Sequence, residues 1–292
     1  MIWQTSRFTI DLSSPRVMGI VNVTPDSFSD GGRYLSADGN VAAAMAHCEQ
    51  LIRDGADILD IGGESSRPGA PPVPLAEELA RVLPVVRHAV DLGVPLSIDT
   101  YKPDVMQAVL DMGADAINDI WALRQPGALG VLARHRSCGV CLMHMHGEPQ
   151  TMQSVPMTGD VVPVVRAFLH QAARDLQLAG VVAPRILLDA GIGFGKTVTQ
   201  NFSLLARQDE LLSLGFPLLA GWSRKSSLAA VCKSTVSTDP ASRLVPSVTA
   251  AILAVERGAR VLRVHDVKQT VQALDVWQAV TNPKSSYKSL NN

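Results

Sequence analysis

Apolar residues fall along the chain in short runs, separated by longer segments of helical spacing. In three of these runs a glycine precedes a short apolar stretch, which ends in a polar residue five positions after the glycine: 54–60, 112–118 and 257–263. Such a glycine ends a helix in left-handed geometry, and such a stretch is typical of a buried strand. Looser copies lie at 93–99, 139–144 and 215–221, with further buried runs at 17–21 and 185–188. The pattern therefore predicts eight strands.

The segments between these runs predict eight helices, at 41–53, 75–92, 103–112, 127–136, 161–179, 201–214, 244–257 and 267–280. Their boundaries carry suitable residues, such as Pro103 at a first helical position and Gly180 just past an end. Strands alternating with helices predict a single (β/α)₈ barrel, the TIM barrel, whose usual size is about 250 residues. A doubly wound open sheet is the alternative. The barrel is favoured because no linker divides the chain and polar residues follow nearly every strand.

We therefore expect one domain over residues 1–292, with a core at about 16–281. Residues 1–15 alternate apolar and polar positions and predict a short lead-in that closes the bottom of the barrel. The tail at 282–292 has the composition of a frayed end.

The composition limits which classes of binding partner are expected. The 292 residues are 47% apolar and carry 26 Lys and Arg against 27 Asp and Glu, so the net charge of -1 gives no general reason to expect nucleic acid or an anionic membrane. No apolar run approaches the ~20 residues of a membrane helix, and residues 1–9 lack the apolar core of a signal peptide. We expect a cytoplasmic protein.

Two short motifs could indicate metal or thiol chemistry. Cys138 and Cys141 have CxxC spacing, but Cys141 lies in an apolar run and no second pair follows, which favours buried structural cysteines. His144 and His146 could begin a zinc site. Because no third partner is evident, the preferred interpretation is that His144 ends the fifth strand.

Residues 189–197 read DAGIGFGKT, which ends like a phosphate-binding P-loop. A P-loop needs a glycine five positions before the Gly-Lys pair, where this chain has Ala190. The glycines also miss the GxGxxG spacing of a dinucleotide site. The stretch is interpreted as a glycine-rich turn that begins with Asp189.

In a TIM barrel the active site lies at the carboxyl ends of the strands. The polar residues predicted there are Asn22, Asp60, Asp99, Asn118, His144, Asp189, residues 223–226, Arg263 and His265. Capping could explain any one of them, but not readily so many at one end. Carboxylates and amides suit the N–H donors of an amino-pyrimidinone, whereas the cations suit a phosphate or diphosphate with Mg²⁺. Two long loops, 24–32 and 62–72, are candidate lids.

Seven motifs resemble the dihydropteroate synthases of bacterial folate synthesis, in that family's order: 18–32, 60–69, 97–100, 117–120, 189–197, 223–226 and 263–267. The resemblance implies a TIM barrel that joins p-aminobenzoate to 6-hydroxymethyl-7,8-dihydropterin diphosphate and releases diphosphate. It implies an S_N1-like path that depends on Asp99, Asp189, Lys225, Arg263 and His265, and a homodimer formed through the later helices.

The resemblance also implies a position for each substrate. The pterin would contact Asp60, Asp99, Asn118, Ile120, Met143, Asp189, Lys225 and Arg263, the last by stacking on its face. Asn22, Arg263 and His265 would hold the diphosphate, with Mg²⁺ on Asn22. The p-aminobenzoate slot would comprise Phe28, Ser66, Arg67, Pro68, Phe194, Lys225 and Ser226. Thr24, Asp26 and Asp30 would belong to the closing first loop.

Departures from the family pattern are modest: Ala190 stands where many members have proline, Ser66 stands where many have threonine, and Trp222 lies just before the motif at 223–226. No insertion interrupts the second loop, which predicts ordinary sulfonamide sensitivity. Two alternatives are a pterin-binding methyltransferase domain with a cobalamin partner and a non-catalytic barrel. The first would need neither the lid loops nor the diphosphate residues, and the second would not need the complete set of polar residues.

Overall fold

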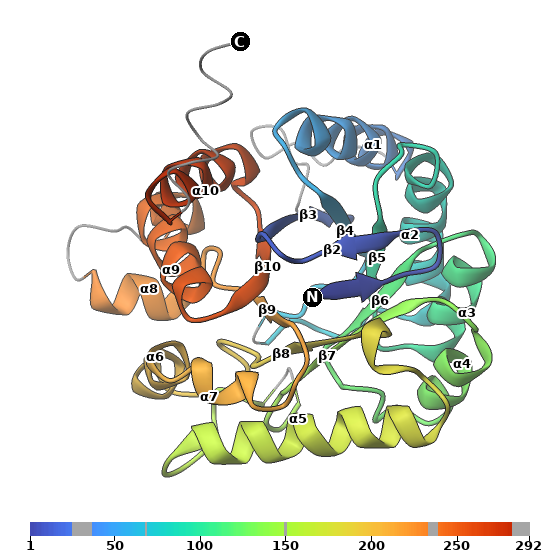
Figure 1. The fold of residues 1–292 in the computed structure, drawn as a ribbon. Coiled ribbons are helices and arrows are strands. Elements are labelled where there is room, and N and C mark those ends of the chain that lie inside the picture. Colours follow the sequence, from blue (N-terminus) through green and yellow to red (C-terminus); the bar gives the residue numbers. More distant parts are fainter. Residues whose placement is uncertain (25–36, 68, 149–150, 233–238, 282–292) are drawn as a thin grey trace.

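The computed structural model describes residues 1–24, 37–67, 69–148, 151–232 and 239–281. Its barrel strands are β3 (Arg16–Asn22), β4 (Ile58–Gly62), β5 (Leu96–Asp99), β6 (Ala116–Asp119), β7 (Gly139–Met143), β8 (Ile186–Asp189), β9 (Leu218–Ala220) and β10 (Ala259–Val264). They are parallel and close in the order β10-β3-β4-β5-β6-β7-β8-β9 (Figure 1). The predicted (β/α)₈ barrel is confirmed.

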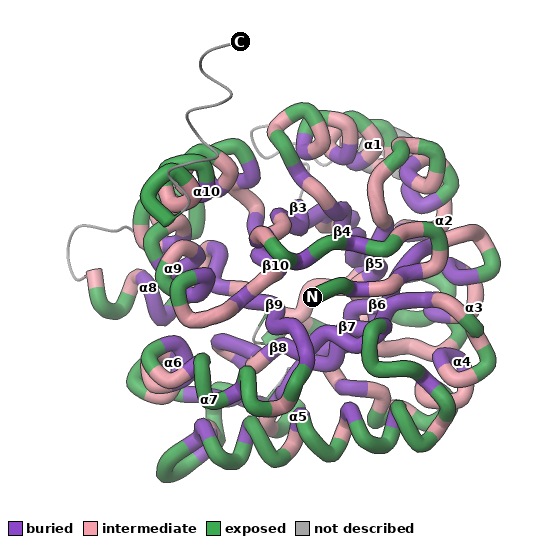
Figure 2. Tube along the Cα trace, viewed as in Figure 1, coloured by how far each residue is buried: buried purple, intermediate pink, exposed green. Residues whose placement is uncertain are grey.

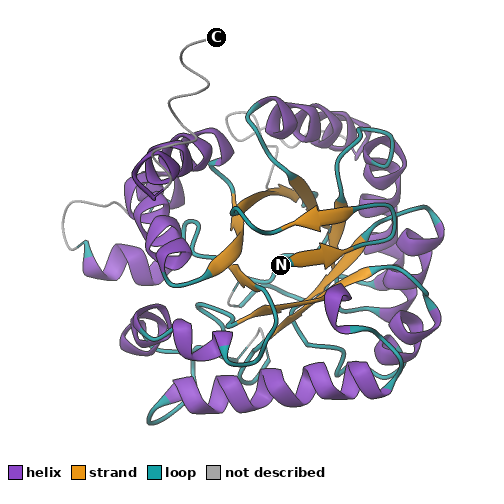
Figure 3. Cartoon of the chain, viewed as in Figure 1, coloured by secondary structure: helices purple, strands orange, loops and turns teal. Residues whose placement is uncertain are grey.

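Helices surround the barrel on its outside (Figure 3). They are α1 (Ala37–Arg53), α2 (Leu75–Ala89), α3 (Pro103–Asp111), α4 (Ala128–Arg134), α5 (Val161–Leu178), α6 (Val198–Ala206), α7 (Asp209–Leu212), α8 (Ser226–Val231), α9 (Leu244–Glu256) and α10 (Val267–Thr281), with short 3-10 turns at Ala183–Arg185 and Pro240–Arg243. Their outer faces are exposed, whereas the strands and the helix faces against them are buried (Figure 2). The main apolar core therefore fills the layer between strands and helices.

The single helix predicted at 201–214 is wrong, because two helices, α6 and α7, occupy this region. The first begins three residues earlier than predicted, at Val198, because Thr197 and Gln200 form a capping box. The helix then ends near Gln208, whose buried amide donates to the carbonyls of Ala254 and Arg257 at the end of α9. The break thus places the Gln208 amide against two carbonyls at the end of α9.

The lead-in closes one end of the barrel, as the sequence predicts. Strands β1 (Ile2–Gln4) and β2 (Thr9–Asp11) form an antiparallel hairpin that lies across the opening (Figure 1). Trp3 is fully buried, and its Nε1 donates to the carbonyl of Arg185 at 3.0 Å. The hairpin packs on apolar side chains from seven strands: Met18, Ile58, Ala116, Cys141, Leu187, Leu219 and Val261. Since the strands are parallel and begin at this end, their carboxyl ends open at the opposite end.

None of the helices in the described ranges is both long and apolar enough to span a membrane.

Candidate active site

Strand alternation decides which polar side chains enter the barrel. Five interior residues at the hairpin end are Ile58, Ala116, Cys141, Leu187 and Val261. Two positions further along the same strands stand Asp60, Asn118, Met143, Asp189 and Arg263. Because side chains two apart on a strand share a face, these five also point into the barrel, one layer nearer its open end. This layer is the floor of the candidate site.

The floor contains a hydrogen-bonded network around Arg263. Its Nε donates to Oδ2 of Asp60 at 2.6 Å, and its Nη2 donates to Oδ2 of Asp99 at 2.7 Å. Asn118 Nδ2 donates to the same oxygen of Asp60 at 3.2 Å. Four of the predicted site residues, from β4, β5, β6 and β10, thus meet across the barrel.

This network leaves one acceptor unused. Asp60 is fully buried, and its Oδ1 has no partner among the described residues. Burial raises the pKa of Asp99, and the negative charge of Asp60 adds to this rise although Arg263 opposes it. For Arg263, the two carboxylates outweigh the effect of burial and raise its pKa above the ordinary value. The guanidinium is therefore charged, and the carboxylates offer acceptors to an N–H-rich ligand.

Asp189 and Lys225 also lie in the site, and each shifts the pKa of the other. Asp189 Oδ1 accepts from the N–H of Gly191 at 2.7 Å. Burial raises the pKa of Asp189, although this hydrogen bond and Lys225 oppose the rise. Burial lowers the pKa of Lys225 to about 8, with Asp189 opposing it. The Lys225 ammonium lies 4.4 Å from the ring centroid of Phe194, within cation–π range.

Phe194 belongs to an apolar cluster with Ile120, Met143, Met145 and Met152. Three of the residues predicted to contact substrates, Ile120, Met143 and Phe194, therefore lie together. The loop that carries Phe194 packs tightly: a Cβ at Gly191 would lie 1.9 Å from the carbonyl oxygen of His144. Gly191 also has a φ of 68°, which favours glycine.

Lys196 shapes the same loop, and its role could not be read from the sequence. It is only 2% exposed, and burial lowers its pKa to about 7. Its Nζ donates to the carbonyls of Gly191 at 2.8 Å, Phe194 at 3.1 Å and His144 at 3.3 Å. Lys196 therefore binds the turn from inside rather than presenting a charge to a ligand.

Ser223, Arg224 and Lys225 follow β9, and α8 begins at the exposed Ser226. Arg224 adopts a left-handed conformation with φ 58° and forms an ion pair with Asp266 at 2.6 Å. Next to Asp266, His265 lies 2.9 Å from Ser223, measured from Nδ1 to Oγ. Burial lowers the pKa of His265 well below its ordinary value, and neighbouring arginines add to this effect.

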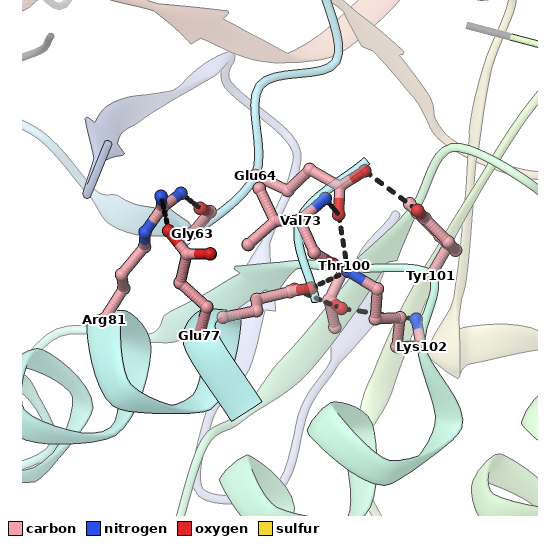
Figure 4. A network of polar contacts seen from close by, with 9 residues as sticks. Gly63, Glu64, Val73, Glu77, Arg81, Thr100, Tyr101 and Lys102 are labelled. Carbon is pink, nitrogen blue, oxygen red and sulfur yellow. Dashed lines mark hydrogen bonds and ion pairs between the residues drawn. The ribbon is translucent and has the colours of Figure 1, made fainter. Parts of the chain in front are cut away.

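The second loop is fastened at its base by a polar network (Figure 4). Lys102 Nζ donates to Oε2 of Glu64 and of Glu78, both at 2.5 Å, and to the carbonyl of Val73 at 2.7 Å. Tyr101 donates its hydroxyl to Glu64 Oε1 at 2.8 Å. Glu64 and Val73 lie at the two ends of the loop, so this network holds the ends together. Sequence reasoning missed it.

A small cleft lies beside this network, lined by Glu64, Ser66, Glu78, Asp99, Thr100, Tyr101 and Ile120. Ser66 thus reaches the same cleft as Asp99, whereas Arg67 is exposed. Asn22 is half-buried at the end of β3, in register with Gly62. Thr24 follows it, but Asp26, Phe28, Asp30 and Pro68 lie outside the described residues, so their predicted roles stay predictions.

His144, Cys138 and Cys141, from the histidine and cysteine motifs, are packed in the interior. His144 directly follows β7 and packs edge-to-face on Phe168 with the ring centroids 4.9 Å apart, and burial lowers its pKa to about 2. Cys138 and Cys141 are buried free thiols, as predicted. Within the described parts of the chain, no group of three or more His, Cys, Asp or Glu side chains could hold a metal ion.

Comparison with known proteins assigns the family. Residues 18–265 match the family described as pterin binding enzyme. The chain therefore belongs to the family of pterin-binding enzymes. It is 49% identical over 281 residues to the dihydropteroate synthase of Neisseria meningitidis serogroup C, covering 96% of this chain and 97% of that protein. This confirms the resemblance drawn from the sequence motifs.

Two solved structures extend the similarity to ligand complexes. The dihydropteroate synthase of Burkholderia cenocepacia complexed with 7,8-dihydropteroate has a TM-score of 0.86 and 49% identity, covering 97% of this chain and 98% of that chain. The dihydropteroate synthase of Yersinia pestis, in a sulfonamide drug complex, has a TM-score of 0.88 and 42% identity, covering 96% of this chain and 99% of that chain.

Proposed function

We infer that this chain is a dihydropteroate synthase, which condenses 6-hydroxymethyl-7,8-dihydropterin diphosphate with p-aminobenzoate. The observation that carries this inference is the hydrogen-bonded network at the floor of the barrel, which joins Asp60, Asp99, Asn118 and Arg263. Such a floor matches the donors of an amino-pyrimidinone. The similarity of nearly the full chain to a synthase whose solved complex contains 7,8-dihydropteroate supports the same reaction. A methyltransferase domain has no comparable support.

The pterin would bind against this floor. The free Oδ1 of Asp60 and the oxygens of Asp99 and Asp189 are the available acceptors for its N–H groups. Lys225 would donate to the carbonyl side of the ring, and Ile120 and Met143 would pack on its apolar surface. Arg263 is fixed by Asp60 and Asp99, so its guanidinium is preorganised to stack on the ring.

The diphosphate would lie toward Asn22, Arg263 and His265. Asn22 fits the predicted Mg²⁺ because its amide oxygen is a hard donor and its side chain has no hydrogen bond to any described residue. A magnesium site with one protein ligand is reasonable, since this ion usually keeps waters and binds through substrate phosphates. When bound, the ion would neutralise part of the charge of the leaving diphosphate.

The p-aminobenzoate would occupy the slot beside Phe194 and the Lys225 stem, with Ser66 and Ser226 toward its carboxylate. Phe194 supports this position because Lys225 lies over its ring and the hydrogen bonds of Lys196 fix its loop. Phe28 and Pro68 would complete the slot. Thr24, Asp26 and Asp30 would approach when the first loop closes.

The chemistry follows an S_N1-like path. The bond between the exocyclic carbon and the diphosphate oxygen breaks, and its electron pair leaves with the diphosphate. Arg263 and His265 stabilise the leaving charge, while the carboxylate floor stabilises the cation that the reduced pterin delocalises. The aniline nitrogen then forms the new carbon–nitrogen bond and releases its proton to solvent or diphosphate. Because the nucleophile is neutral, positioning is the main contribution of the slot.

We also propose a homodimer formed through the later helices. Val245 on α9 and Val276 and Val280 on α10 are 73%, 68% and 76% exposed, and these two helices pack side by side. Large exposed apolar groups on neighbouring helices suit a self-association surface. The Val276→Glu variant should shift the mass measured by light scattering toward the monomer. A cytoplasmic location stays a prediction.

The activity is tested by mixing the purified protein with dihydropterin diphosphate, p-aminobenzoate and Mg²⁺, and following diphosphate release. Turnover that requires both organic substrates is the expected result. The Lys225→Met variant should lose turnover, whereas Lys268→Met, at an exposed position of α10, should retain it. A folded parent protein with no turnover above background would overturn the assignment.

A further inference from the structure

Ser223 makes two contacts with His265. The Ser223 side chain is largely buried after β9, at 8% exposure. Its Oγ accepts a hydrogen bond from the backbone N–H of His265 at 3.1 Å and lies 2.9 Å from His265 Nδ1. One hydroxyl thus contacts both the backbone and the ring of the residue that is proposed to meet the diphosphate.

The single hydrogen of the Ser223 hydroxyl determines the direction of the hydrogen bond between Ser223 Oγ and His265 Nδ1. A serine hydroxyl has one hydrogen and two acceptor lone pairs, and the backbone N–H of His265 occupies one lone pair. Among the described residues, His265 Nδ1 is the only acceptor within hydrogen-bond distance of that hydrogen. A proton on Nδ1 would leave the hydroxyl hydrogen without a partner in a mostly buried place. The hydroxyl therefore donates to Nδ1, and a neutral ring carries its own hydrogen on Nε2.

The surroundings of the ring favour the neutral form and fix its position. Burial lowers the pKa of His265, and the neighbouring cations Arg224, Arg263, Arg67 and Lys225 also disfavour a further positive charge on the ring. Arg224, the residue after Ser223, also joins the segment after β9 to the segment after β10, because its guanidinium pairs with Asp266 at 2.6 Å. The two segments are thus held by adjacent contacts, Ser223 with His265 and Arg224 with Asp266.

We propose that Ser223 is a positioning residue that holds His265 as the neutral tautomer protonated on Nε2, so that the ring offers an N–H donor to an anion. The identity of that anion, diphosphate, rests on the proposed function, whereas the tautomer does not. Arg263 then supplies charge to the leaving group, and His265 supplies a directed hydrogen bond.

The tautomer is measured on the protein without substrate. Long-range proton–nitrogen NMR of histidine-labelled protein distinguishes the two ring nitrogens, and the spectrum of His265→Gln assigns the His265 signals. The parent should show the pattern of a neutral ring protonated on Nε2, and Ser223→Ala should lose this preference. A parent ring protonated on Nδ1 or on both nitrogens would overturn the proposal, as would an unchanged tautomer in Ser223→Ala. Absence of synthase activity would not affect this measurement.

Kinetics test the functional consequence. The side-chain nitrogen of glutamine can take the place of Nε2, and that of asparagine the place of Nδ1. His265→Gln should therefore retain at least about tenfold more kcat/KM for the dihydropterin diphosphate than His265→Asn, the value of one hydrogen bond to a charged group. Ser223→Ala should lose about tenfold by the same argument, while the KM for p-aminobenzoate stays near that of the parent.

Ser213→Ala, at the end of α7 and outside the site, is the control and should match the parent. Equal activity of the glutamine and asparagine variants, or a Ser223→Ala variant with changed tautomer and parental kcat/KM, would refute the directed hydrogen bond. If Ser223→Ala does not fold, the NMR spectrum of the parent and the two His265 variants still decide the question.

Discussion

Lys102 is the only cation in direct hydrogen-bond contact with both Glu64 and Glu78 among the described residues, and its removal should loosen the second loop (Figure 4). The side chains are little exposed: 17% for Lys102, 12% for Glu64 and 1% for Glu78. The Lys102→Met variant keeps most of the stem volume but leaves two carboxylates and the Val73 carbonyl without their shared donor. The expected result is a large loss of stability.

The magnitude follows from the burial of the partners. Removing one member of a buried ion pair costs about 3–5 kcal/mol, because the remaining charge stays desolvated. Glu64 and Glu78 keep weaker donors in Tyr101 and Thr100, which leaves the expected loss at about 3–4 kcal/mol. This is a large part of the roughly 5–15 kcal/mol that stabilises a typical domain. The loop ends should also separate, so the KM for p-aminobenzoate should rise.

Urea unfolding of the parent and variants measures the loss. The double variant Lys102→Met with Glu78→Gln should recover at least about 1 kcal/mol, because the most deeply buried uncompensated charge is removed. Lys268→Met is the matched control on an exposed surface and should lie within about 0.5 kcal/mol of the parent. A loss below about 1 kcal/mol for Lys102→Met, with no recovery in the double variant, would refute the reasoning.

Four further predictions follow from the site. Pterin affinity should fall above pH 8, because the lowered pKa of Lys225, about 8, means that its ammonium deprotonates there; titration calorimetry that shows a flat profile to high pH contradicts this. Asp99→Asn and Asp189→Asn should each weaken pterin binding about tenfold, since a donor replaces an acceptor, and parental affinity would show that the pocket is misplaced. Lys196→Met should raise the KM for p-aminobenzoate more than the Kd for pterin, because the turn that carries Phe194 loses the hydrogen bonds of Lys196. Lys196→Arg should preserve these bonds in part. Equal effects of Lys196→Met on both substrates would argue against this role of Lys196. A folate-pathway knockout carrying this gene should stay sensitive to sulfonamide, and growth at a high concentration of the drug would contradict that.

The sequence predicted the barrel and its polar floor because both depend on local periodicity. A strand fully buried in a TIM barrel reads as a short apolar run, and the polar residue at its end lies two positions beyond an interior residue. Asp60 after Ile58 and Asp189 after Leu187 illustrate this relation. Neither position needs information from distant parts of the chain, so both could be predicted.

The contacts that support the site depend on residues far apart in the sequence. Glu64 and Lys102 are separated by 38 positions, and a charged residue in a loop gives no signal of burial before the loops are placed. The division of the predicted helix at 201–214 has the same cause, because Gln208 finds its acceptors 46 and 49 positions away. Local pattern identifies which polar side chains enter the barrel, whereas tertiary contacts decide what holds those side chains in place.

The Gly-Lys-Thr sequence at 195–197 shows how the same residues can serve opposite purposes. A P-loop lysine directs its ammonium outward to phosphates. Here Lys196 Nζ is directed inward to three carbonyl acceptors, and Thr197 uses its hydroxyl to cap α6. A phosphate would have to displace these bonds in a place that is 2% exposed, so this turn is unsuited to bind a nucleotide. Because Lys196 bonds to the carbonyls on the inside of the turn, the turn places the Phe194 ring beside the Lys225 ammonium. In the proposed function, phosphate recognition instead falls to Asn22 at the end of β3 and to Arg263 and His265 at the end of β10.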